Sequence, residues 1–165
     1  MGDRAAFLIA KLSLLPHPEG GYYREVYRSV SQVQPGGDRP QRSALTTIYF
    51  LLTEGQYSRW HRVLSDEVWH FYEGEPLELF WLDTDKDERT QALLGPVQGG
   101  SEQCPVQTVP AGCWQAARST GAYTLAGCTV APGFDFADFS LLEDGSEEAG
   151  RIQRSFPGIC DGSSE

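Results

Sequence analysis

The chain has 165 residues, a hydrophobic fraction of 40% and a net charge of −10. This length is enough for one domain with a hydrophobic core. A strongly acidic surface repels nucleic acid and anionic membranes, so we expect neither of them as a partner.

Three further features bear on where the protein resides. The N-terminal residues lack the apolar run of a signal peptide after a basic start, and no stretch approaches the length needed to span a membrane. The four cysteines show no C-x2-C pairing of the kind that binds zinc. We therefore expect a cytoplasmic protein that does not contact a membrane.

Short strands separated by turns dominate the expected secondary structure. A helix is expected from about residue 4 to residue 12, with Asp3 as its N-cap and Pro16 beyond its end. The apolar and aromatic residues that follow occur in short runs, and eighteen glycines and ten prolines supply the turns between them. So many strands in one short chain predict an all-β sandwich or barrel. The expected strands are residues 20–28, 44–53, 58–63, 67–73, 77–83, 92–96, 106–110, 113–119, 123–130 and 136–142.

The end of the chain differs in composition from the rest. From about residue 144 it is acidic and rich in Gly and Ser, which is typical of a flexible tail, although Ile152 and Phe156 could anchor it. No internal repeat or linker interrupts the sequence, so we assign residues 1–165 to a single domain.

The stretch from Gly55 to Gly74 has the most informative spacing in the chain. It follows the pattern G-x5-H-x-H-x3-E-x6-G of metal sites in small β-barrels, but Val63 stands where the second histidine should be. In an extended strand side chains alternate between two faces, so the odd-numbered residues from 61 to 67 share one face. His61 and Glu67 can therefore converge on one cavity, from which Val63 has removed a ligand.

A second segment, residues 109–115, is expected to deliver a further side chain into the same space. In barrels of this kind its Pro-x-Gly lead-in brings in a third ligand, but here the delivered residue is Gln115. An amide is a poor ligand for a transition metal compared with imidazole. With Val63 and Gln115 in place of two imidazoles, the sequence predicts no tightly held metal and no other cofactor.

With these two segments the chain resembles the cupin superfamily, and it is most similar to the fifth cupin family of small single-domain proteins of unassigned function. The matching stretches are residues 17–23, 65–74, 109–117 and 130–139. The resemblance implies a double-stranded β-helix, or jelly roll, which the short N-terminal helix precedes here. It also implies a dimer and a relationship to the dTDP-sugar epimerases, but no known reaction.

Four residues are the leading candidates for chemistry in the cavity. His61 could act as a general base, and Glu67 could orient it or share its proton. Arg59 shares the parity of both, so we expect its guanidinium to hold a phosphate or carboxylate of the ligand. We expect the Gln115 amide to bind a hydroxyl or carbonyl. The alternatives are structural: a core histidine, an ion pair of Glu67 with Arg59, and a cross-strand hydrogen bond of Gln115.

Five more residues are candidates for contact with the ligand. Trp69 and Phe71 share one parity and could form an aromatic wall, although aromatic side chains in a barrel are more often plain core. Tyr22 or Tyr23 could supply a phenol as the acid partner of the histidine, with packing in the core as the alternative. Asp138 could line the cavity or cap the end of a strand.

These candidates support two functions, with a third ranked behind them. The first is an epimerase- or isomerase-like cupin that acts on a nucleotide-linked or phosphorylated sugar, which rests partly on analogy of fold. The second is a non-catalytic barrel that binds a nucleotide or a sugar. A metal-dependent dioxygenase comes last, because Val63 and Gln115 replace the ligands that it would need.

The sequence also predicts how the chain assembles. Many strands leave sheet edges that must be protected, and pairing of two identical copies is a common solution. We expect a homodimer, so light scattering at micromolar concentration should report twice the monomer mass of 18.2 kDa. A mass equal to that of the monomer would contradict this prediction.

Overall fold

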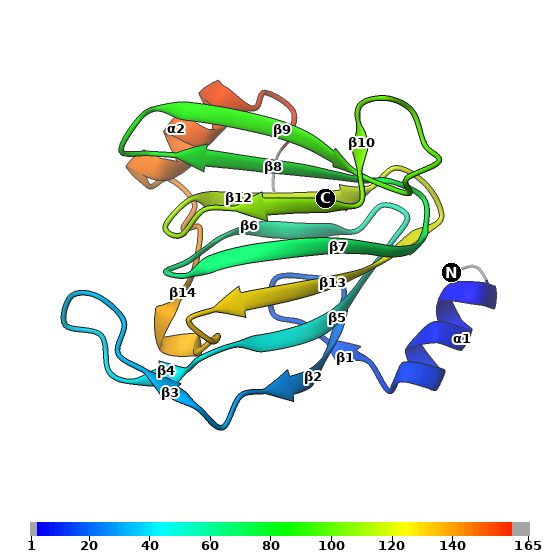
Figure 1. Cartoon of the computed structure of the whole chain (residues 1–165). Coiled ribbons are helices and arrows are strands. Elements are labelled where there is room, and N and C mark those ends of the chain that lie inside the picture. Colours follow the sequence, from blue (N-terminus) through cyan, green and yellow to red (C-terminus); the bar gives the residue numbers. More distant parts are fainter. Residues whose placement is uncertain (1–2, 160–165) are drawn as a thin grey trace.

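The computed structural model describes residues 3–159 and consists mainly of β-strands (Figure 1). Helix α1 (Asp3–Leu12) begins the chain, which confirms the expected N-terminal helix. The strands are β1 (Leu15–Pro16), β2 (Tyr22–Arg28), β3 (Gln32–Val33), β4 (Arg42–Ser43), β5 (Thr46–Thr53), β6 (Tyr57–Val63), β7 (Asp66–Gly74), β8 (Leu77–Asp83), β9 (Glu88–Leu94), β10 (Gln103–Cys104), β11 (Val106–Val109), β12 (Trp114–Ser119), β13 (Tyr123–Ala131) and β14 (Phe139–Leu141). A 3₁₀ turn, η1 (Phe136–Asp138), precedes β14, and helix α2 (Glu147–Ser155) follows it.

Two six-stranded sheets face each other. Their strand orders are β1-β2-β5-β13-β7-β11 and β10-β9-β8-β12-β6-β14, and a small β3–β4 ribbon extends from one end (Figure 1). Strands that are neighbours in a sheet are mostly distant in the sequence, as in β5-β13-β7 and β8-β12-β6. This is the double-stranded β-helix that the resemblance to the cupins implied, and it confirms the expected all-β fold.

The core lies between the two sheets because apolar residues alternate along the strands. Phe50 and Trp69 from the first sheet pack on Leu79 and Ala117 from the second, and all four are almost fully buried. Each large side chain buried in this way contributes roughly 1.5–3 kcal/mol to stability. The core therefore fixes the spacing of the sheets, and with it the shape of the space between them.

A β-bulge in β6 changes the direction of its side chains. His61 pairs with Gln115 of β12, but Ser58 pairs with Ala117, so two residues of β6 oppose one residue of β12. The extra residue breaks the period-two alternation at this point. As a result Ser58 and His61 are both buried, while Arg59 between them is exposed.

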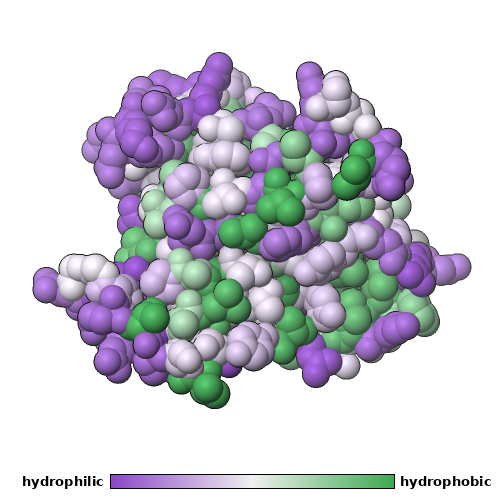
Figure 2. All heavy atoms as spheres, viewed as in Figure 1, coloured by the Kyte–Doolittle hydropathy of each residue, from purple (hydrophilic) through white to green (hydrophobic). Residues whose placement is uncertain are grey.

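Helix α2 covers part of the outer face of the second sheet. Its Ile152, together with Phe156 just beyond its end, is buried in a cluster with Trp60 and Phe80. Its other face is exposed to solvent, and Figure 2 shows hydrophilic side chains over this region. The stretch expected to be a flexible tail therefore contains a packed helix, while its last residues, 160–165, lie outside the described residues. Between residues 3 and 159 no helix is both long and apolar enough to cross a membrane.

The packing of Phe156 can be tested by mutation. Its ring lies 5.4 Å from the ring of Trp60 and 5.7 Å from that of Phe80, measured between centroids. Because Phe156→Ala leaves a cavity there, we expect it to lower the free energy of unfolding by about 3–5 kcal/mol in chemical denaturation. As a control, Val97→Ala alters a side chain that is 75% exposed and should change stability by no more than about 0.5 kcal/mol. A loss as small as that of the control would mean that the C-terminal segment contributes little to stability.

Candidate functional site

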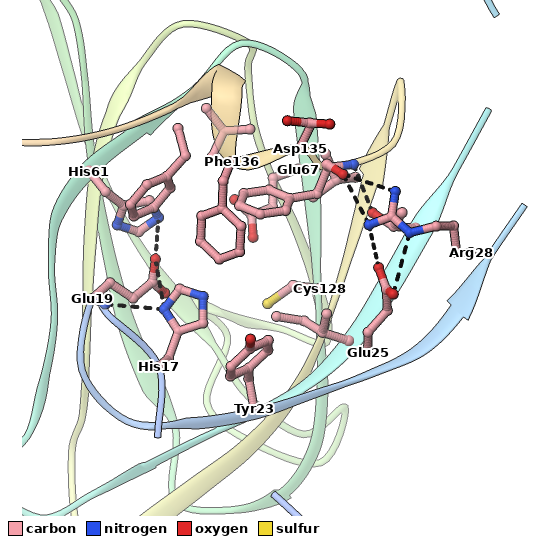
Figure 3. A pocket seen from close by; sticks show the side chains of 16 residues that line it. His17, Glu19, Tyr23, Glu25, Arg28, His61, Glu67, Cys128, Asp135 and Phe136 are labelled. Atoms are coloured by element: carbon pink, nitrogen blue, oxygen red, sulfur yellow. Dashed lines mark hydrogen bonds and ion pairs between the residues drawn. The ribbon is translucent and has the colours of Figure 1, made fainter. Parts of the chain in front are cut away.

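A cavity of about 350 Å³ lies between the sheets, at the end where β14 and η1 are located (Figure 3). Its walls come from β2, β5, β6, β7 and β13, from the loop before β2 and from the segment around η1. Apolar and aromatic side chains form most of the lining. The polar groups in its interior include two carboxyls, two imidazoles and one thiol, which belong to Glu19, Glu67, His17, His61 and Cys128.

Both ring nitrogens of His61 are engaged by neighbouring groups. Nδ1 lies 2.7 Å from the carbonyl oxygen of Arg59, and because a carbonyl can only accept, Nδ1 carries the hydrogen. Nε2 faces Oε2 of Glu19 at 3.1 Å, and the ring stacks on Phe139 with 5.6 Å between centroids. Burial lowers the pKa of His61, although the charge of Glu67 opposes this effect. The neutral ring therefore presents the lone pair of Nε2 to Glu19.

Glu19 supplies the proton for the hydrogen bond to Nε2 of His61. Its carboxyl is buried, and its Oε1 accepts a hydrogen bond of 3.0 Å from the Ser58 hydroxyl. Burial raises the pKa of Glu19 to about 8, although the Ser58 hydrogen bond acts in the other direction. At neutral pH the carboxyl is therefore mostly protonated, and the contact with His61 is a hydrogen bond from Oε2–H to Nε2 rather than an ion pair.

Two glycines bring Glu19 into this position. Gly20 and Gly21 have φ values of 105° and 72°, which L side chains rarely adopt. A Cβ at Gly20 would lie 2.3 Å from the carbonyl oxygen of Tyr57, so the loop can approach β6 closely only with glycine there. The backbone N–H of Arg59 donates to the Glu19 carbonyl at 2.6 Å and fixes the loop to β6.

His17 lies on the same loop. Its Nδ1 accepts a hydrogen bond of 3.1 Å from the backbone N–H of Glu19, so in the neutral ring Nε2 carries the hydrogen. Burial, and secondarily the like charge of His61, lowers the pKa of His17 to about 4. The 3.7 Å approach of Nδ1 to the Glu19 carboxyl is therefore a contact between neutral groups at pH 7. The N–H of Nε2 faces the open part of the cavity (Figure 3).

Glu67 extends into the cavity from β7, and a hydrogen bond from Gln115 of β12 fixes its carboxyl. Its Oε2 accepts a 2.6 Å hydrogen bond from Nε2 of Gln115, whose Oε1 accepts from the indole N–H of Trp69 at 3.2 Å. Burial raises the pKa of Glu67 to about 7, with His61 lowering it and Glu19 raising it. Glu67 also holds the Cys128 thiol, whose pKa is raised well above its usual range by burial. A carboxyl with this pKa can either take up or release a proton at neutral pH.

The structure brings some of the sequence candidates together. His61, Glu67 and Tyr23 line the cavity, and Gln115 fixes Glu67 from the second sheet. His17 and Glu19 were not predicted as site residues, although both belong to residues 17–23, one of the stretches that carry the family resemblance, and directly precede the Gly20–Gly21 turn. An imidazole and a carboxyl two residues apart, directly before such a turn, is the signal that could have found them.

Arg59 lies outside the cavity, so the prediction that it shares a face with the histidine was wrong. The bulge in β6 turns its side chain outward, where it is exposed. A basic side chain does line the cavity, but it is Arg28, at the end of β2.

Four other candidates also lie away from the cavity. Trp69 is buried in the main core and Phe71 packs against it, so neither forms the expected aromatic wall. Tyr22 packs against the cluster beneath α1, because the strand alternation sends Tyr23 inward instead.

Asp138, the last of them, is occupied by an ion-pair network. Its carboxylate accepts hydrogen bonds from the guanidinium groups of Arg39 at 2.7 Å and Arg42 at 2.8 and 3.0 Å. These bonds lower its pKa. Asp138 therefore ties residues 39–42 to η1, where it neither faces the cavity nor caps a strand.

The donor groups in the cavity do not fit a metal centre. Within residues 3–159 no group of three or more His, Cys, Asp or Glu side chains is arranged to hold a metal ion. The nitrogens of His61 already pair with a carbonyl and a carboxyl, and Val63 forms part of the wall. The Gln115 amide is used by Glu67 and Trp69.

The protonated state of Glu19 predicts how stability depends on pH. The carboxyl titrates near 4.5 in the unfolded chain and near 8 in the folded one, so between these values only the folded state keeps the proton. The stabilisation due to Glu19 is therefore fully present below about pH 4.5 and is lost as pH rises through 8, with about 2 kcal/mol of the loss between about pH 6.5 and 8. His17 contributes a pH dependence mainly below this window, because its pKa is about 4 in the folded protein and 6.5 in the unfolded chain, so that above pH 6.5 it is largely neutral in both states.

Glu19→Gln should remove this part of the pH dependence. Its amide can still donate to His61 and accept from Ser58, so the fold is expected to survive. Denaturation at several pH values should show a flatter profile than that of the wild type, and Glu67→Gln, as the companion variant, should remove only the share due to Glu67. An unchanged slope in Glu19→Gln would show that Glu19 is already ionised in the folded protein.

Comparison with known proteins agrees with this architecture. The model of the fifth cupin family, described as "Cupin superfamily (DUF985)", matches residues 6–142. A hypothetical protein from Leishmania major is 34% identical, with a TM-score of 0.79 over 93% of this chain and 92% of its own. A protein from Shewanella oneidensis is also 34% identical, with a TM-score of 0.76 over 95% and 92% of the two chains.

More distant structures share the fold alone. The oxalate decarboxylase of Lactobacillus farciminis is 14% identical, with a TM-score of 0.55 over 78% of this chain and 33% of its own. No curated protein matches the sequence. The family match over most of the chain and the two relatives at 34% identity establish that this protein belongs to the fifth cupin family of the cupin superfamily.

Proposed function

We propose that this cupin binds a small carbohydrate in the cavity and transfers protons on it, as an epimerase- or isomerase-like enzyme for a phosphorylated or nucleotide-linked sugar. One observation carries the proposal. Two buried carboxyls, with pKa values raised to about 8 and about 7, flank one neutral imidazole in a single cavity. Carboxyls tuned to neutral pH in this way are suited to acid–base catalysis.

The shape and lining of the cavity support a sugar ring as the ligand. A volume of about 350 Å³ suits one small molecule. Phe134, Phe136 and Phe139 form a group of edge-to-face rings along one wall. The flat face of a sugar ring carries C–H groups that pack well on aromatic rings, while its hydroxyls can reach the carboxyls and imidazoles.

The arrangement supports a specific division of roles. The Glu67 carboxylate would take a proton from a carbon next to a carbonyl, and the electron pair of that C–H bond would move into an enolate. The N–H of His17 Nε2, which faces the cavity, would donate to the enolate oxygen. Tyr23, whose hydroxyl points into the cavity (Figure 3), would return a proton to the carbon from the other side. The last step inverts that carbon.

In this scheme His61 is not the base that contacts the substrate. Both of its nitrogens are engaged, by Arg59 and Glu19. We assign it the role of accepting the Glu19 proton in a hydrogen bond at Nε2, which keeps both groups neutral beside Glu67.

The same engagement of His61 favours the alternative of a non-catalytic barrel that binds a nucleotide or a sugar. A binding protein needs polar groups fixed in place, and the hydrogen-bond chains through Glu19 and Gln115 supply them. The two functions differ only in whether a proton of the ligand exchanges with solvent.

A ligand screen followed by an exchange assay separates them. Thermal shift with sugar phosphates and nucleotide sugars identifies ligands, and each ligand is then incubated with the protein in D2O and followed by NMR. We expect deuterium to enter one carbon of a bound sugar, and Glu67→Gln to slow this exchange by about 10²–10⁴-fold while it still binds the ligand. The control Arg59→Gln changes an exposed residue outside the cavity and should leave the exchange rate unchanged. Binding without deuterium incorporation would favour the non-catalytic barrel.

A further inference from the structure

The positive charge around the cavity is concentrated in one side chain. Of the residues described as its lining, Arg28 is the one lysine or arginine, and it forms an ion pair with Glu25. Arg28 lies at the open side of the cavity with its side chain 45% exposed. Figure 3 places it across the cavity from His61 and Glu19. An anionic group of a ligand therefore has one cationic partner available, and it lies at the mouth.

The Arg28 guanidinium is held in a fixed orientation. Its Nη2 donates to Oε1 of Glu25 at 2.6 Å and its Nε donates to Oε2 at 3.3 Å. Nη1 and Nη2 both donate to the carbonyl oxygen of Phe134 at 3.1 Å. A guanidinium has five N–H groups, so these four bonds leave one N–H, on Nη1. If a ligand displaced Glu25 from Arg28, the bonds to the Phe134 carbonyl would still hold the guanidinium at the mouth of the cavity.

We infer that Arg28 is the anion contact of this cavity and that Glu25 competes with the ligand for it, an inference that rests on the proposed sugar ligand. The Arg28–Glu25 pair lies three residues apart on the surface with both side chains well exposed, and pairs of this kind are weak. A phosphate can offer two oxygens to the same guanidinium edge and form a stronger, charge-assisted pair. The phosphate of a sugar phosphate would therefore replace the Glu25 carboxylate while the sugar ring occupies the cavity.

A purely structural role for Arg28 makes a different prediction. If Arg28 only anchored the Phe134 carbonyl, removal of the Glu25 charge would not strengthen the binding of an anion. If Glu25 is a competitor, Glu25→Gln should strengthen it, because the bond to Phe134 keeps the guanidinium in place. The sign of the Glu25→Gln effect therefore distinguishes the two roles.

The experiment is calorimetric titration of four proteins with glucose 1-phosphate and with glucose. For the wild type we expect glucose 1-phosphate to bind more tightly than glucose. Arg28→Gln should weaken binding of the phosphate about tenfold or more and leave glucose unchanged, because one charge-assisted contact is lost. Glu25→Gln should bind glucose 1-phosphate several-fold more tightly. Arg59→Gln, which removes an exposed arginine outside the cavity, should match the wild type.

Each outcome decides the inference. Equal binding of glucose 1-phosphate by Arg28→Gln and the wild type, or no gain in Glu25→Gln, overturns the role of Arg28 but leaves the sugar-binding function in place. If the wild type binds neither probe, the proposed sugar ligand and the inference both fail. If Arg28→Gln does not fold, as judged by circular dichroism, the Glu25→Gln titration decides alone.

Discussion

One proton, shared between Glu19 and His61, allows both side chains to be buried in this cavity without a net charge. Glu19 and His61 are both buried, and a charged carboxylate or imidazolium there would cost several kcal/mol if it were unpaired. Burial moves the two pKa values in opposite directions, up for Glu19 and down for His61. The proton therefore resides on the carboxyl and is donated to Nε2 of the imidazole at 3.1 Å, so that two potentially charged groups are accommodated as one neutral pair.

This pair exists because of two local irregularities in the backbone. The Gly20–Gly21 turn lets the loop before β2 approach β6. The β6 bulge turns both Ser58 and His61 inward, where each contacts one oxygen of the Glu19 carboxyl. A regular strand would send the side chains of Ser58 and His61, three residues apart, to opposite faces. The bulge is thus part of the site, as bulges near functional sites often are.

The same bulge shows which features of the site the sequence could predict. An all-β sandwich or barrel followed from the short apolar runs and turn signals, because these patterns are local, and the resemblance to the cupins narrowed it to the double-stranded β-helix. The spacing of His61 and Glu67 placed both at one cavity correctly, since each faces inward on its own strand. Arg59 was misplaced because an extra residue in β6 becomes visible only when β6 is paired with β12. The pairing of Glu19 with β6 could not be predicted, because its partner Ser58 is 39 residues away and no sequence pattern joins the two.

The ionisable groups that line the cavity constrain how a ligand can lie in it. Glu67 has a pKa of about 7, and a negative group brought close to it would raise that pKa further, because like charges disfavour the ionised form. A phosphate next to Glu67 would therefore keep the carboxyl protonated and unable to act as a base. With the phosphate at Arg28 instead, the anion is neutralised at the solvent-exposed mouth, and Glu67 remains free to ionise near neutral pH. A sugar phosphate bound with its phosphate next to Glu67 would still occupy the cavity, but Glu67 would stay protonated and could not act as the base.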